Sequence, residues 1–298
     1  MLDWNTPKLS DKEWIEKCVK ESQYIGSDAA FANIYLLRSK YNIKVTYYKD
    51  LLIRYYEGLG NRKGYTFPLG RKDVLSALYA IEQDAKEMNR PLEFCFVTEE
   101  QKEILENTFA GRTESSSDAG DYDYIYGQPE LSLLSGRTYH KKKNHVSKFK
   151  RTYEDYMICE IGNGNLDDVM LIEDEWYYDR LQQDDTSAMK EYEAIREAVD
   201  NFEELSLSGG IIYANNVPVA MTIASYINDA AVDIHFEKAV GEYAVNGGFA
   251  AINQMYASTL KDVKYINREE DINIPGLRKA KESYHPKFML KKYGVRVK

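Results

Sequence analysis

Apolar and polar residues follow helical and strand periods along most of the chain, and the two patterns occur in a similar order twice. In the first part, the patterns predict helices over 10–21, 27–41, 73–88 and 99–109, and strands over 43–48, 51–56, 65–69, 92–97 and 122–126. Lys49-Asp50 suits a two-residue hairpin turn. Residues 111–121 are rich in Ser, Gly and Asp, which predicts a loop.

The second part repeats and extends that order. Its patterns predict helices over 130–153, 166–181, 187–205, 249–260 and 277–283, strands over 156–161, 210–214, 217–226, 231–238 and 264–267, and a final hairpin of strands 287–292 and 295–297. This is the element order of the GNAT acyltransferase fold. We therefore predict an α/β fold (α+β mixed sheet) of tandem GNAT-like domains, 1–128 and 129–298, with the N-terminal copy degenerate and the basic helix 130–153 as the link.

The composition excludes several classes of function but does not identify one. A net charge of −9 argues against a chain that wraps nucleic acid along its whole length. No apolar run reaches the roughly 18 residues of a membrane helix, and the chain starts with polar residues, so we expect a cytoplasmic protein. The three cysteines, Cys18, Cys95 and Cys159, are far apart, which predicts buried free thiols and no structural zinc.

A basic segment stands out in this acidic chain. Residues 137–151 contain seven Lys or Arg residues and no acid. Such a helix can bind phosphates, whether of tRNA, of the coenzyme A diphosphate or of a lipid head group, and we expect Arg137, Lys141 and Lys142 to contact the substrate. The alternative is a solvated helix that balances acidic neighbours. His140 and His145 lack partners for a metal site, and no metal is expected.

The strand over 231–238 contains the best candidates for acid/base chemistry. By strict alternation, Asp233, His235 and Glu237 point to one face. Three titratable groups there are costly unless they are paired or face a cleft. A neutral His235 could accept the proton of an attacking amine or hydroxyl, oriented by Asp233 or Glu237. The alternative is a solvent-exposed strand face.

The stretch 264–286 combines acids, bases, an amide, an imidazole and a phenol around a Pro-Gly turn. Two substrate contacts are predicted within it: an ammonium site and an anion clamp. The ammonium site would use Asn267, Glu270 and Asp271, the clamp would use Arg278 and Lys281, and Tyr284 would line the same site. The alternative is that these charges form salt bridges that tie the loop to the following helix.

Glycines precede the helix over 249–260, where a GNAT fold holds the acyl-CoA diphosphate on backbone amides. Here the spacing of Gly241, Gly247 and Gly248 does not match the usual motif, and Glu242 adds an acid where the anion would lie. Acyl-CoA is therefore the weaker donor candidate. Aminoacyl-tRNA avoids this objection and suits the basic helix.

Three segments carry a resemblance to a known family: 134–145 (LSGRTYHKKKNH), 234–239 (IHFEKA) and 266–286 (INREEDINIPGLRKAKESYHP). With these, the chain resembles bacterial proteins similar to the C-terminal domain of phosphatidylglycerol lysyltransferase (DUF2156-like), relatives of the peptidoglycan-bridge aminoacyltransferases. The resemblance implies acyl or aminoacyl transfer to an amine or hydroxyl acceptor, with tRNA or an anionic small molecule as partner. A lipid substrate is not implied, because the lysyltransferases handle lipid with a membrane-spanning domain. The rival hypothesis is a non-catalytic module that binds an anionic small molecule or nucleic acid through 137–151.

Overall fold

The computed structural model describes residues 2–181 and 188–298 and divides into two compact units. The first unit contains the chain up to Tyr124 together with 269–278 and 288–298. The second contains 125–268 and 279–287. The chain therefore passes between the units several times, whereas the sequence suggested a single boundary at residue 128. Within the described residues, no helix combines the length and apolar character that a bilayer crossing requires.

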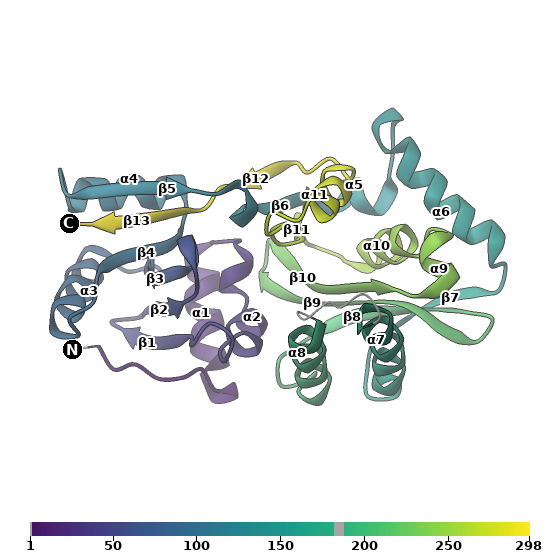
Figure 1. The fold of residues 1–298 in the computed structure, drawn as a ribbon, viewed down its shortest axis with the longest axis horizontal. Coiled ribbons are helices and arrows are strands. Elements are labelled where there is room, and N and C mark those ends of the chain that lie inside the picture. Colours follow the sequence, from purple (N-terminus) through teal and green to yellow (C-terminus); the bar gives the residue numbers. More distant parts are fainter. Residues whose placement is uncertain (1, 182–187) are drawn as a thin grey trace. The chain divides into compact units, whose positions relative to one another are not determined.

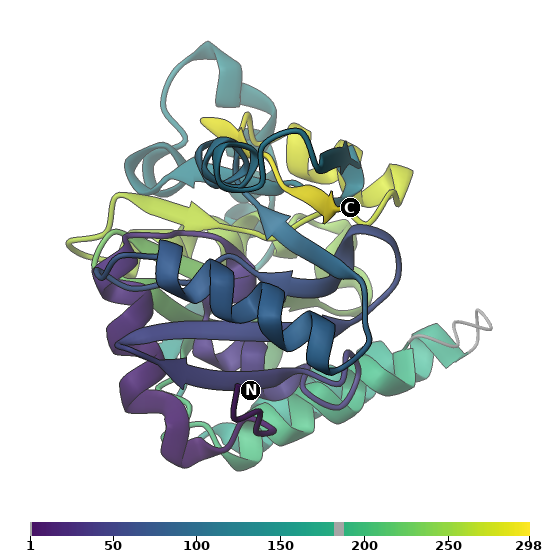
Figure 2. The same cartoon turned by 90° about the vertical axis from the view of Figure 1, so that its left-hand side faces the viewer.

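The first unit is built on a six-stranded sheet of order β1-β2-β3-β4-β13-β5. Its strands are β1 (Lys44–Tyr48), β2 (Leu51–Glu57), β3 (Lys63–Thr66), β4 (Leu92–Val97), β5 (Thr113–Ser117) and β13 (Tyr293–Val297), and its helices are α1 (Lys12–Ser22), α2 (Phe31–Leu36), α3 (Leu75–Glu87) and α4 (Glu99–Thr108). The predicted β1–β2 hairpin is confirmed: both turn residues have positive φ, 50° at Lys49 and 65° at Asp50. Figure 2 shows α3 lying across this sheet, where Leu78 and Ile81 enter the core.

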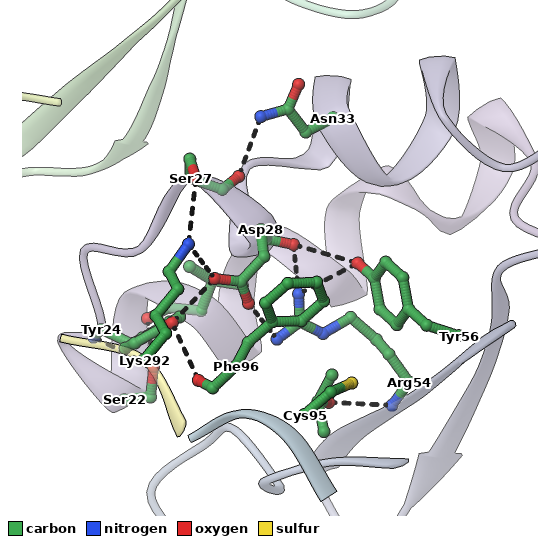
Figure 3. A network of polar contacts seen from close by, with 12 residues as sticks. Ser22, Tyr24, Ser27, Asp28, Asn33, Arg54, Tyr56, Cys95, Phe96 and Lys292 are labelled. Carbon is green, nitrogen blue, oxygen red and sulfur yellow. Dashed lines mark hydrogen bonds and ion pairs between the residues drawn. The ribbon is translucent and has the colours of Figure 1, made fainter. Parts of the chain in front are cut away.

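A buried polar network lies beside that core (Figure 3). Lys292 Nζ is 2.7 Å from Asp123 Oδ1 and 3.1 Å from Asp28 Oδ1. Arg54 Nη2 is 2.9 Å from Asp28 Oδ2, and Tyr24 donates its hydroxyl to the same carboxylate. The four charged side chains are at most 4% exposed and their charges cancel. Because Lys292 directly precedes β13, the network joins the last strand of the chain to this unit.

The second unit is built on the seven-stranded sheet of order β12-β6-β11-β10-β9-β8-β7. The strands of this sheet are β6 (Asp123–Gly127), β7 (Tyr156–Glu160), β8 (Ser208–Ala214), β9 (Val217–Asn228), β10 (Ala231–Ala239), β11 (Tyr265–Asn267) and β12 (Phe288–Leu290), of which β12 and the first two residues of β6 are grouped with the first unit. The helices after β6 are α5 (Gln128–Leu133), α6 (His140–Thr152), α7 (Leu166–Leu181), α8 (Ala188–Asp200), α9 (Gly241–Val245), α10 (Gly248–Thr259) and α11 (Pro275–Glu282), and α11 is divided between the units after Arg278. In Figure 1, α10 covers one face of this sheet and α7 and α8 cover the other. On the α10 side, Phe149, Ile212 and Ala251 lie in one apolar cluster.

Four predictions of secondary structure are corrected. The basic helix over 130–153 is broken, because Leu134 and Gly136 have φ of 46° and 88° and separate α5 from α6. The loop over 111–121 contains the edge strand β5, and the final hairpin does not form, because β12 and β13 join different sheets. The predicted helix over 187–205 ends at Asp200, and its first residue lies outside the described residues.

A β-bulge in β10 corrects the predicted face of the acid/base residues. Asp233 pairs with Ser225 of β9, but Glu237 pairs with Thr222, with a register shift between Ile234 and Phe236. Directly paired residues share a face and alternate along a strand. Ser225 and Thr222 are three residues apart, so Asp233 and Glu237 face opposite sides of the sheet. A single bulged residue reverses every later side chain, and strict alternation could not reveal it.

Candidate functional site

The face of the sheet under α10 holds a charged cluster centred on Glu237. One carboxylate oxygen of Glu237 lies 2.7 Å from Arg268 Nη2, and the other accepts a hydrogen bond of 3.0 Å from Asn253 Nδ2. Arg268 directly follows β11, which runs parallel to β10, and Asn253 faces the sheet from α10. The side chains of Glu237 and Arg268 are each 11% exposed. Arg268 Nη1 is buried and makes no hydrogen bond with the described residues.

Two cations meet on one aromatic ring beside this cluster. Lys142 Nζ lies 3.8 Å and the Arg268 guanidinium 4.7 Å from the centre of the Tyr284 ring, which is buried. Burial and the neighbouring charge of Arg268 lower the pKa of Lys142 to about 8, while Glu237 opposes the shift. At neutral pH, a measurable fraction of Lys142 is therefore an uncharged amine.

The packing of α6 explains why Lys142, among the basic residues, reaches this position. Val146 and Phe149 bury the inner side of the helix. Lys142 lies one turn before Val146 and shares its side, whereas Lys141 and Lys143 are exposed. The same helix thus presents one lysine inward and several outward.

A second polar group lies on the opposite face of the sheet. His235 Nε2 is 2.8 Å from Ser225 Oγ, and His235 Nδ1 is 3.4 Å from Asp233 Oδ2. These contacts resemble those of a Ser-His-Asp triad, but the distance between His235 Nδ1 and Asp233 Oδ2 is too long for a strong hydrogen bond. The side chains of His235 and Asp233 are 1% and 0% exposed, and Ser225 is buried as well. The geometry is that of buried polar packing rather than of an open nucleophile.

The sequence profile of the C-terminal region of phosphatidylglycerol lysyltransferase matches residues 20–296. The chain belongs to this family. No curated protein matches it significantly.

Solved structures show the fold of this family member. A conserved protein of unknown function from Bacteroides thetaiotaomicron VPI-5482 is 30% identical, with a TM-score of 0.93 and both chains covered completely. L-PGS from Bacillus licheniformis is 14% identical, with a TM-score of 0.67 over 96% of this chain and 92% of the other. FemX is 8% identical, with a TM-score of 0.62 over 100% and 98%. The predicted mixed α/β fold of tandem GNAT-like units is confirmed.

In the family segment that follows β11, the charged side chains form salt bridges and hydrogen bonds with other residues of this chain. Asp271 accepts two bonds from Arg278, of 2.8 and 2.9 Å, and one from Tyr124. Glu270 lies 2.8 Å from Arg62. These contacts agree with the alternative interpretation of this segment, in which its charges form salt bridges instead of an ammonium site and an anion clamp.

The other predicted members of those two contacts are also engaged. Lys281 donates to the carbonyl of Arg268, which fixes the backbone that presents the Arg268 guanidinium. Asn267 is fully buried beside Asp233 in the β10–β11 pairing. Arg278 and Lys281 thus have separate partners and do not form a joint clamp.

Of the predicted site residues, Lys142, Glu237 and Tyr284 come together, while Arg137 and Lys141 lie on the surface. Two members of the cluster, Arg268 and Asn253, were missed as site residues. Arg268 lies in a run of five polar residues, 267–271. The charges in such a run do not show which side chain points into the protein. The signal for Asn253 was a lone amide on the sheet-facing side of the otherwise apolar start of α10.

Proposed function

We propose that the second unit catalyses acyl or aminoacyl transfer to an amine or hydroxyl acceptor at the cluster of Lys142, Glu237, Asn253, Arg268 and Tyr284. The observation that carries the proposal is the pair of cations on the Tyr284 ring, one of which is a lysine with a pKa of about 8. A proton carrier with a pKa near the working pH is what general acid/base catalysis requires. Family membership supports the same reaction class.

Each residue has a role in this scheme. The acceptor attacks the donor's ester or thioester carbonyl while its proton passes to the neutral amine of Lys142. The carbonyl oxygen becomes negatively charged and is stabilised by the unpartnered Nη1 of Arg268. Collapse of the tetrahedral intermediate breaks the donor's C–O or C–S bond, and protonated Lys142 returns the proton to the leaving group. Glu237 is a positioning residue, because both of its oxygens hold neighbouring side chains.

An aminoacyl-tRNA donor is favoured over acyl-CoA by two observations. The outer side of α6 and the turn before it present Arg137, Lys141 and Lys143 to solvent, as a phosphate backbone requires. At the junction before α10, the carbonyl oxygen of His145 lies only 2.4 Å from where a side chain at Gly247 would begin. The α6 backbone thus lies against the glycines on which a coenzyme A diphosphate would rest.

The first test compares Lys142→Met with its exposed neighbour Lys143→Met. Purified variants are assayed for transfer from charged tRNA and from acetyl-CoA to amine and hydroxyl acceptors. We expect Lys142→Met to lower kcat about 10²-fold or more, the usual contribution of a proton carrier. Lys143→Met removes only a surface phosphate contact, so it should leave kcat unchanged and raise KM for charged tRNA alone. Saturable binding without product would support the rival binding module. Full activity of folded Lys142→Met would exclude the proposed role.

The acid/base role first predicted for His235 is tested in the same assay. The scheme above gives His235 and Asp233 no part in proton transfer, because they face away from Glu237. If folded His235→Ala loses activity while Lys142→Met retains it, the chemistry belongs to the other face of the sheet. Circular dichroism spectra and melting curves establish that each variant is folded.

A further inference from the structure

An open hollow of about 510 Å³ lies in the first unit, where the segment before α1 passes the end of α2. It is lined by residues 6–10, Thr-Pro-Lys-Leu-Ser, together with Tyr35 and Arg38. Small-molecule sites in proteins typically have volumes of roughly 300–1,000 Å³, so the hollow is large enough for an organic ligand. None of these residues takes part in the transfer cluster, which belongs to the second unit.

The segment on one side of the hollow is fixed to the sheet. Asn5 forms two backbone hydrogen bonds with Val45 of the edge strand β1, of 3.0 and 2.8 Å. Lys44 Nζ, on the same strand, donates a hydrogen bond of 2.7 Å to Thr6 Oγ1. Residues 6–10 are therefore held in a defined position and do not extend into solvent.

Arg38, on the other side, is held against its own helix. Its guanidinium lies 3.8 Å from the centre of the Tyr35 ring, and its Nη1 donates a hydrogen bond of 2.5 Å to the carbonyl oxygen of Tyr35. A planar guanidinium that is stacked in this way presents its N–H donors in a fixed orientation. Such a fork matches the oxygens of a phosphate, and little side-chain entropy is lost on binding.

The charges around the hollow favour an anion. Lys8 and Arg38 line it, the ammonium of Lys44 is bonded to its lining, and no described residue that lines it is acidic. Asp11, the nearest acid along the chain, is outside the lining. Its oxygens accept hydrogen bonds of 2.8 Å from the backbone N–H of Lys8 and of 3.2 Å from the ring of Trp14. Three positive side chains thus gather here in a chain whose net charge is −9.

The rest of the surroundings favour a phosphate ester over a free phosphate ion or a nucleic acid. Pro7, Leu9 and Tyr35 provide apolar surface that an inorganic phosphate would leave uncovered. The basic surface does not continue along α1, where three lysines are balanced by three glutamates. A nucleic-acid backbone needs cations at successive phosphates. A single phosphate with an apolar substituent matches this combination.

We propose that this hollow is a binding site for a small phosphomonoester. Arg38 and Lys8 hold the phosphate, whose several acceptor oxygens can be shared between separate donors, and Ser10 offers a hydroxyl from the same lining. The organic substituent lies against Pro7 and Leu9. Because the site is formed by residues of the first unit alone, it does not depend on the proposed transfer reaction.

Binding is tested by titrating the full chain with phenyl phosphate, with phenol and benzylamine as probes of similar size that lack the negative charge. The methyl resonances of Leu9 should shift on addition of phenyl phosphate, because Leu9 lines the hollow. Those of Ile15, which is fully buried on α1, should not move. No shift of Leu9 with phenyl phosphate, or an equal shift with phenol, would overturn the proposal.

Inorganic phosphate, titrated in the same way, separates the ester from the free ion. It should bind more weakly than phenyl phosphate, because it leaves the apolar lining uncovered. If the two affinities are equal, the assignment to an ester is wrong. Binding of phenyl phosphate should weaken as NaCl is raised, since the lysine and the arginine are partly exposed to screening ions.

Substitutions locate the contacts. Arg38→Gln and Lys8→Gln should each weaken phenyl phosphate binding about fivefold, the loss expected for one partly exposed ion pair. Arg38→Lys should have an intermediate affinity, because it keeps the charge and loses the planar fork. Lys40→Gln is the matched control, since this exposed lysine lies over the Tyr41 ring and does not line the hollow.

Circular dichroism spectra and melting curves establish that each variant is folded. Lys8 is exposed, so Lys8→Gln keeps the test valid if Arg38→Gln fails to fold. Unchanged affinity in Lys8→Gln, or an equal loss in Lys40→Gln, would overturn the proposed site. Lys142→Met, which tests the transfer reaction, should leave the Leu9 shift unchanged, and loss of that shift would also contradict a site in the first unit.

Discussion

At the scale of single residues, neighbouring lysines on one helix have different chemistry because of the side on which they lie. Lys142 lies over a buried ring and beside an arginine, and its pKa is lowered to about 8 by burial and by that neighbour. Lys141 and Lys143, one residue away on either side, are exposed. The helical period alone identifies the inward lysine once Val146 and Phe149 are known to be buried. The sequence could not show this directly, because all three lysines fall in one basic run.

The buried carboxyl of Glu173 predicts a specific pH dependence of stability. Burial raises its pKa to about 7, Lys238 opposes the shift, and Glu191 and Asp174 reinforce it. The folded protein therefore keeps this proton up to about pH 7, whereas the unfolded chain releases it near the ordinary value of 4.5. Unfolding releases a proton within that window, so the free energy of unfolding should decrease as pH rises from 4.5 to 7.

Glu173→Gln tests this prediction, since the amide stays neutral at every pH. Urea unfolding of both proteins between pH 5 and pH 8 should show the wild type losing stability relative to Glu173→Gln as pH rises. Glu193→Gln, an exposed acid on α8, should follow the wild type. A constant difference between wild type and Glu173→Gln would mean that Glu173 is already ionised at pH 5.

At the scale of elements, the periodicity of apolar residues predicted helices and strands correctly where one face of the element is buried. It failed for a strand that has no apolar face, and it could not show which sheet a strand joins. The strands of the second unit and the helix beginning near Phe249 were predicted within a few residues. β5 was missed because Thr113–Ser117 is polar and exposed, with no apolar face to alternate. The separation of β12 from β13 was missed because sequence proximity favours a hairpin. Which sheet a strand joins is decided by distant partners.

The contact between α6 and α10 should depend on a glycine. Gly247 has φ of 102°, and its β-carbon would lie 2.4 Å from the carbonyl oxygen of His145. Gly247→Ala should therefore destabilise the protein by about 2 kcal/mol or more, from left-handed strain and from displacement of α6. Gly164→Ala is the control, because no atom of the described residues lies within 4 Å of where its β-carbon would be.

Thermal and urea unfolding of the two variants measure this difference. Because Lys142 lies on α6, Gly247→Ala should also return the pKa of Lys142 toward that of an exposed lysine, which NMR titration of the side-chain amine can follow. An equal stability of Gly247→Ala and Gly164→Ala would show that α6 moves aside at no cost.

At the scale of the whole molecule, local sequence patterns could not predict which segments of the chain belong to which unit. The sequence suggested two consecutive domains, but β13, at the very end of the chain, lies between β4 and β5 of the first unit. Local periodicity assigns an element its type, while its partners depend on packing between residues nearly two hundred positions apart. The buried network around Lys292 holds this returning strand by charge as well as by backbone pairing.

That arrangement predicts that one lysine near the C-terminus controls the stability of the first unit. Lys292→Met removes the positive charge between Asp28 and Asp123, leaving a buried carboxylate uncompensated. Breaking a buried ion pair in this way costs about 3–5 kcal/mol. Lys291→Met is the matched control, since its side chain is exposed and one residue away.

Hydrogen exchange measured by mass spectrometry can show where the loss occurs. In Lys292→Met, amides of β2, β4 and β13 should exchange much faster than in the wild type, because these strands share the sheet that the network supports. Amides of β8, β9 and β10 should keep their protection, because their core is formed by different residues. A double variant, Lys292→Met with Asp123→Asn, should recover part of the protection, because Arg54 then balances the one remaining carboxylate, that of Asp28. Equal exchange in Lys292→Met and Lys291→Met would show that backbone pairing alone holds the last strand in place.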